Sequence, residues 1–258
     1  MDIVTGRIVA TLLFVVLPAS LLEAQPSESM AGLLLRLDNE HDYAQKSRLL
    51  NGLTSEYPDA GGGLLRLARS TKNTDTRWMA MRGMAMLHYT AGAPFLKVSL
   101  KNSDWVVRAN AARALGDLRI TNAANALLAM FAVEQEPAVV EQASLALHML
   151  NVKAAAPYIR ERIPRFTGQT RSWLLQALGA LGSDSDVPLI AGYLDSSDPA
   201  SAMTAMAAAY ALEELVSVQF GPHVTGASAL PGPETLLARS WWGSHKDQWP
   251  RCDDCHRK

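Results

Sequence analysis

The sequence predicts an all-α protein, an α-solenoid in which antiparallel helix pairs stack into a superhelix. The first observation is a repeat of about 31 residues, because five apolar anchors are separated by 31, 32, 31 and 34 positions. The second is that apolar side chains around each anchor recur with the spacing of one helix face. The third is the lack of alternating strand patterns. A helical pattern that recurs at a fixed period is typical of a stacked array. The anchors are Met84, Leu115, Leu147, Leu178 and Leu212.

A second helix is predicted in each repeat. Pro94, Pro157 and Pro188 follow their anchors by ten residues, and proline suits the first turn of a helix because the N–H it lacks would have no partner there. Each copy then shows an i, i+4 apolar pair, such as Leu96 with Leu100. We expect about six helix pairs over residues 40–217, preceded by a linker or cap at residues 25–39.

The N-terminus reads as an export signal. Ile8 to Leu22 is an almost unbroken apolar run of about 15 residues, short of the roughly 20 that span a bilayer. We therefore expect residues 1–24 to be a signal peptide cleaved after Ala24, and the protein to be periplasmic or secreted. The alternative is an uncleaved anchor, the one case in which membrane contact is expected.

Composition argues against nucleic acid as a partner. The 258-residue chain is 48% hydrophobic, which is enough for a large core. Residues 1–24 hold two of the 25 acidic and one of the 24 basic side chains, so the remainder is electrically balanced. A balanced chain offers no general attraction to a polyanion.

One repeat carries a family pattern. Residues 103–116 read as an acidic cap, Val-Arg, an Ala-Ala pair and Ala-Leu-Gly, and Ala177-Leu178-Gly179 repeats the last part. This segment resembles HEAT repeats of the short bacterial type, the phycobilin-lyase HEAT-like repeats. The resemblance covers roughly residues 40–217 and implies an armadillo-like solenoid that binds proteins. The tetratricopeptide and ankyrin patterns are absent.

Enzyme activities associated with the family find no match in the residues. Deoxyhypusine hydroxylases hold two iron ions with His-Glu pairs, and the chain has no His-Glu dipeptide. No bilin lyase motif, nucleophile motif, zinc-protease motif or phosphate loop is present either. We therefore expect a non-enzymatic scaffold that binds a protein or peptide on its concave face, with no small-molecule substrate identified.

Three arginines are candidate binding residues. Arg77, Arg108 and Arg171 each stand one place after the first slot of the anchor-bearing helix. The family resemblance implies ion pairs between such arginines and acids of neighbouring repeats. The alternative is a basic stripe on the concave face that binds an acidic peptide. His88 and His148 fall on or beside apolar helix faces, where hydrogen-bonded core histidines are expected.

The repeats end before a different C-terminal region. Residues 218–233 have no helical period and predict a loop, and residues 234–250 predict a capping helix that bears Trp241, Trp242 and Trp249. We expect the tryptophans to cover the exposed face of the last repeat. The alternative is an aromatic patch that binds a partner.

The tail at residues 251–258 contains the only two cysteines, in the order Cys252-Asp-Asp-Cys255-His256. This spacing is the attachment signature of haem c, with two thioether bonds and an axial imidazole on the iron. A disulfide and a zinc site are the alternatives at the same residues. The leading expectation is a protein without cofactor, and the second hypothesis is an electron-transfer protein carrying haem c.

Overall fold

The computed structural model describes residues 28–195, 199–221 and 232–249, without the side chains of residues 199–201. Within these ranges the chain forms helices and no strand, as the repeat predicts. The α-helices are α1 Met30–Asn39, α2 Tyr43–Glu56, α3 Gly61–Ser70, α4 Thr74–Met86, α5 Ala93–Ser99, α6 Trp105–Asp117, α7 Ala124–Val133, α8 Pro137–Met149, α9 Ala156–Arg162, α10 Gly168–Leu181, α11 Val187–Ala191, α12 Pro199–Val216 and α13 Pro233–His245.

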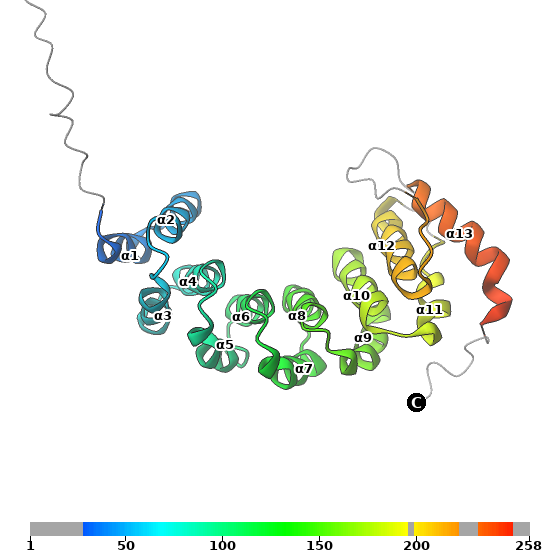
Figure 1. Cartoon of the computed structure of the whole chain (residues 1–258), viewed down its shortest axis with the longest axis horizontal. Helices are drawn as coiled ribbons and strands as arrows, with labels where there is room; N and C mark the ends of the chain where they lie inside the picture. The colour runs from blue at the N-terminus through cyan, green and yellow to red at the C-terminus, as the bar shows by residue number, and fades with distance from the viewer. Residues whose placement is uncertain (1–27, 196–198, 222–231, 250–258) are drawn as a thin grey trace, which may run out of the picture.

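The helices pair into two layers of a curved array (Figure 1). The even-numbered helices from α2 to α12 pack one on the next and form the concave layer. The odd-numbered helices from α3 to α11 each pack on the following even-numbered helix and form the convex layer. Helix α13 closes the C-terminal end of the array by packing on α12.

Helix starts follow the cap residues of the sequence. The side chain of Asn73 accepts hydrogen bonds from the first backbone N–H groups of α4, and Asp104 does the same for α6. Pro94 and Pro157 lie in the first turns of α5 and α9, as predicted. The array begins earlier than residue 40, because Ser29 caps α1 and this helix buries Leu37 against α2 and α3.

Small residues bring the concave helices together. A Cβ atom at Gly179 would lie 2.5 Å from Cα of Ala211, and one at Gly116 would lie 2.9 Å from Cα of Ala146. These glycines therefore mark close backbone contacts between α10 and α12 and between α6 and α8. Neighbouring convex helices after α3 touch much less, so the array bends toward the concave layer.

The core is one continuous apolar seam. All five anchors are fully buried, and the buried cluster runs from Leu33 in α1 to Ala238 in α13. Among the helices that the structure describes, substantial contacts join only neighbours in the array. Each helix pair is therefore stabilised by the pairs beside it. Among the described residues, no helix has both the length and the apolar character needed to cross a membrane.

Candidate functional site

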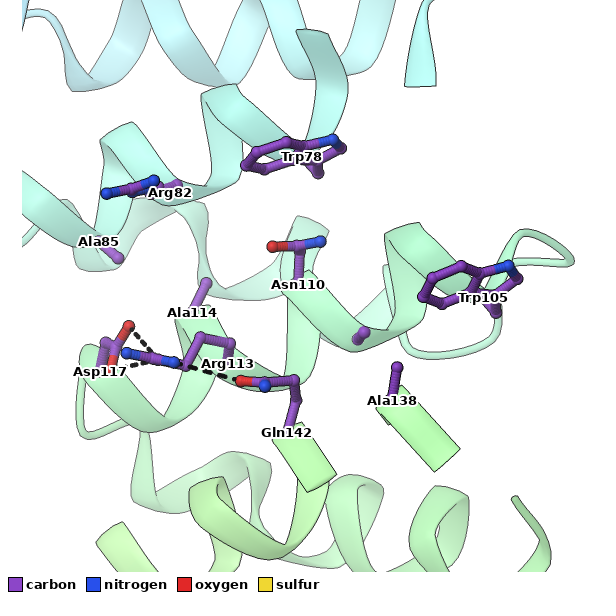
Figure 2. Close-up of a pocket in the computed structure, with 11 residues that line it drawn as sticks. Trp78, Arg82, Ala85, Trp105, Asn110, Arg113, Ala114, Asp117, Ala138 and Gln142 are labelled. Atoms are coloured by element: carbon purple, nitrogen blue, oxygen red, sulfur yellow. Dashed lines mark hydrogen bonds and ion pairs between the residues drawn. The ribbon is translucent and has the colours of Figure 1, made fainter. Parts of the chain in front are cut away.

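A pocket of about 480 Å³ lies on the concave layer, where α4, α6 and α8 meet. Figure 2 shows Trp78 and Arg82 on one side of it and Arg113, Asp117 and Gln142 on the opposite side. Three successive repeats thus supply the lining. The full lining is Trp78, Arg82, Ala85, Trp105, Ala109, Asn110, Arg113, Ala114, Asp117, Ala138 and Gln142.

Two tryptophans give the pocket its apolar surfaces. Trp105 begins α6 and is 46% exposed, although an indole ring favours burial. Trp78 is half-buried, its ring centroid lies 5.9 Å from that of Tyr43, and its Nε1 donates a hydrogen bond of 3.2 Å to Asp75. These contacts hold Trp78 in place while a face of its ring lines the pocket.

The polar side chains differ in how far they are already paired. Arg113 donates hydrogen bonds of 3.0 and 3.1 Å to the carboxylate of Asp117 and one of 3.3 Å to Oε1 of Gln142 (Figure 2). Arg82 is exposed and has no hydrogen-bond or ion-pair partner within the described ranges. The pocket therefore keeps one uncompensated positive charge, and an anionic group of a ligand would be favoured beside Arg82.

The three predicted arginines lie elsewhere and do not line this pocket. Arg77 donates hydrogen bonds to the carbonyls of Ala68 and Thr71, at the end of α3. Arg171 donates to the carbonyl of Ile163, and its guanidinium lies 5.2 Å from the ring centre of Tyr193. Such contacts neutralise helix C-terminal carbonyls at the turn between the two layers.

Within the described part of the chain, Arg108 alone of the three pairs with an acid. Its Nε and Nη2 lie 2.7 and 3.1 Å from the two carboxylate oxygens of Glu134, which belongs to the following repeat. Burial alone would raise the pKa of Glu134, but Arg108 and two backbone N–H groups outweigh it. The pKa of this carboxyl is therefore lowered below its usual 4.5.

The predicted core histidines are at the surface. His88 and His148 are both exposed, and His88 adopts a positive φ of 50° at the turn after α4. His148 lies on α8 in the concave layer, where it lines a smaller cavity of about 300 Å³ with Tyr210 and Glu214 of α12. The expectation of core histidines is wrong because both side chains lie where no neighbouring helix covers them. His88 follows the anchor Met84 by four residues, and His148 follows the anchor Leu147 directly.

The tail predicted to carry a cofactor, Cys252, Cys255 and His256, lies outside the described residues. Over residues 28–195, 199–221 and 232–249, no three His, Asp or Glu side chains are grouped as metal ligands. The tryptophans of residues 234–250 pack against the core at the end of the array. Trp241 lies in the centre of this cluster, with ring centroids 5.6 Å from Phe220 and 5.5 Å from Trp249.

The pocket residues themselves were not predicted. A signal for two of them exists in the sequence, because Arg82 and Arg113 both stand two places before a repeat anchor. Trp105 gave a weaker signal, as a large apolar residue directly after the cap residue Asp104. Such positions are ordinary polar surface in a single repeat, and only the stacking of three repeats shows that they converge.

Comparisons with known proteins agree with this architecture. The family model described as HEAT repeats matches residues 62–148, from α3 to α8. A search of curated proteins finds no match. Among solved structures, the complex of CpcE and CpcF of phycocyanin lyase from Nostoc sp. PCC7120 contains a similar chain. That chain is 17% identical, the match covers 85% of this chain and 97% of that one, and the TM-score is 0.51. At this identity the likeness shows the fold.

The expectation that the protein has no enzyme activity is wrong, because the fold does not support it. The similar chain belongs to a phycocyanin lyase, so a solenoid of this kind occurs in an enzyme-type protein. Missing local motifs are a poor guide in a solenoid, because side chains from separate repeats converge on one pocket, as they do here. The family model shows HEAT repeats at residues 62–148, and the recurrent helix pairs and the shared architecture show that the described chain is an all-α solenoid.

Proposed function

We propose that the concave layer binds a segment of a partner protein, with the pocket of α4, α6 and α8 as its main contact. The single observation that carries the proposal is the combination in one pocket of the exposed Trp105, the half-buried Trp78 and the unpaired Arg82. Exposed tryptophan and arginine side chains are the residue types that dominate binding energy at protein interfaces. The partner segment would place an apolar side chain against the indoles and a carboxylate beside Arg82.

Two further facts support a protein partner. The lining comes from three stacked repeats, whose positions are fixed by nearest-neighbour packing, so the surface needs little reordering on binding. The similar chain of the phycocyanin lyase was solved as a complex of two proteins. The volume of about 480 Å³ suits a few side chains of a peptide.

The test begins with short random peptides displayed as a library and selected on the immobilised protein. The proposal predicts enrichment of sequences that combine an aromatic or aliphatic residue with Asp or Glu. The Arg82→Ala variant should then bind an enriched, fluorescein-labelled peptide about tenfold more weakly, a loss of about 1.4 kcal/mol. Fluorescence anisotropy measures this affinity.

Arg66→Ala is the matched control, because Arg66 is an exposed arginine on α3 of the convex layer. It removes the same charge and should leave the affinity unchanged. If both substitutions lowered the affinity equally, the loss would come from the change in net charge and not from the pocket. An unchanged affinity in Arg82→Ala would place the binding site elsewhere.

We also propose that the protein acts after export, on the support of residues 1–24, which have the length and apolarity of a signal peptide. The tail supports a second candidate function, covalent attachment of haem c at Cys252, Cys255 and His256. One described residue is a candidate for the second axial ligand. Nδ1 of His245 lies 2.8 Å from the carbonyl oxygen of Trp241 and donates to it, which leaves Nε2 as the basic nitrogen able to bind iron.

Absorption spectroscopy tests the haem proposal in protein from a host that matures c-type cytochromes. The expected result is a Soret band and a mass increase equal to one haem, both lost in Cys252→Ser with Cys255→Ser. A mass equal to the bare chain without residues 1–24, with no Soret band, would remove the haem and leave the export proposal intact.

A further inference from the structure

A second groove lies in the convex layer, between α5 and α7, and has a volume of about 540 Å³. Its surface is mainly apolar and includes Leu100, Ala126, Ala129, Met130 and Val133. Val133 is 74% exposed and extends this apolar surface to the solvent. In Figure 1, α5 and α7 belong to the layer opposite the concave pocket.

The neighbouring junction shows why this groove stays open. Met130 of α7 and Arg162 of α9 occupy equivalent positions in successive repeats. Each stands directly before the second residue of its repeat's i, i+4 apolar pair, which is Phe131 in α7 and Ile163 after α9. Arg162 reaches back to α7, donates hydrogen bonds to the carbonyls of Ala132 and Glu134 and covers the ring of Phe131 at 5.1 Å. Met130 offers no such donors, so the end of α5 is left without this cover.

One edge of the groove is cationic. Lys97 on α5 and Lys101 in the turn directly after this helix both line the groove. Lys97 donates a long hydrogen bond of 3.4 Å to Asn122, and Lys101 is exposed. Neither forms an ion pair with an acidic side chain in the part of the chain that the structure describes. The groove thus combines an apolar floor with two uncompensated positive charges.

We propose that this groove docks an amphipathic helix of a partner protein, with acidic residues along one edge of its apolar face. A helix suits the site because its backbone hydrogen bonds are internal, whereas an extended peptide would bring unpaired polar groups to an apolar floor. The space between two adjacent helices accepts the side-chain ridge of a third. Glutamates at i and i+4 of the docked helix would face Lys97 and Lys101.

The test uses a fluorescein-labelled synthetic helix that has a leucine face edged by Glu at i, i+4 spacing, and a second peptide in which Lys replaces each Glu. The Glu peptide should bind the full-length protein, and the Lys peptide should bind at least about tenfold more weakly. Binding of the Glu peptide should weaken as salt is raised, because the two lysines are at the surface.

Val133→Glu should lower the affinity for the Glu peptide about tenfold, because the substitution places a negative charge in the groove. Val98→Glu is the matched control: Val98 is also 74% exposed and lies on α5, but it is not part of the groove lining. Both positions are at the surface, so both variants should fold, as circular dichroism and thermal unfolding would verify. Arg82→Ala should leave this binding unchanged, since Arg82 lies in the concave pocket.

Three outcomes would overturn the proposal. The first is no binding of the Glu peptide, or equal binding of both peptides. The second is equal weakening by Val98→Glu and Val133→Glu, which would indicate charge rather than the groove. The third is concentration-dependent self-association of the unmodified protein that Val133→Glu abolishes, which would assign the groove to a second copy of this chain.

Discussion

Glu134 shows how one residue joins three repeats. Its carboxylate accepts from Arg108 of α6 and from the backbone N–H groups of Gln135 and Glu136, just before α8. Its carbonyl accepts from Arg162 of α9 at 2.7 Å. Of the ion pairs expected of the three recurrent arginines, only that of Arg108 forms among the described residues, while Arg77 and Arg171 donate to carbonyls instead. Sequence spacing could place the arginines on equivalent positions, but not an acid opposite each of them.

A pH-dependent stability follows from this junction. A carboxyl whose pKa is lowered by folding stabilises the folded state above its ordinary pKa of 4.5, and this contribution is lost as the pH falls through the lowered value. Glu134→Gln should reduce the free energy of unfolding by about 1–2 kcal/mol at neutral pH. The difference from the unmodified protein should shrink as the pH falls below 4.5.

Urea unfolding at neutral and acidic pH measures this difference. Glu161→Gln serves as the control, because the pair of Glu161 with Arg165 is exposed and contributes little. A difference for Glu134→Gln that stays the same size at acidic pH would show that the ionised form is not what stabilises the junction.

At the scale of helices, the repeat period predicted most of what is observed. The anchors and the i, i+4 pairs are buried as expected, because a side chain that faces a neighbouring helix must be apolar. The period also placed the glycines, although their role depends on the partner helix: Gly116 and Gly179 meet the backbone of the next concave helix. At the equivalent position α8 has His148, whose exposed imidazole stands where the other two helices have glycine.

The pocket and the groove depend on distances between helices, which no single repeat specifies. Arg82 and Trp105 are 23 positions apart in the sequence and come together only because α4 and α6 pack side by side. The groove in the convex layer depends on Met130 having no polar group where the next repeat has Arg162. The sequence pattern of single repeats therefore predicted the architecture, but it could not predict the concave pocket or the convex groove.

For the whole molecule, the account depends on a core in which each helix pair is stabilised by its neighbours. A compact globular core would respond to a packing defect as one cooperative unit. An array should respond locally, because the units far from the defect keep their own contacts. The two proposed binding surfaces also require this arrangement, since each is built from adjacent repeats.

Hydrogen exchange measured by mass spectrometry on Gly179→Val tests this claim most directly. The added side chain would meet the backbone of Ala211 at 2.5 Å, so α10 and α12 must separate. Gly52→Ala is the control, because open space surrounds Gly52. We predict faster exchange in α9 to α12 with unchanged protection in α4 and α6, and a uniform increase along the whole chain would contradict the account.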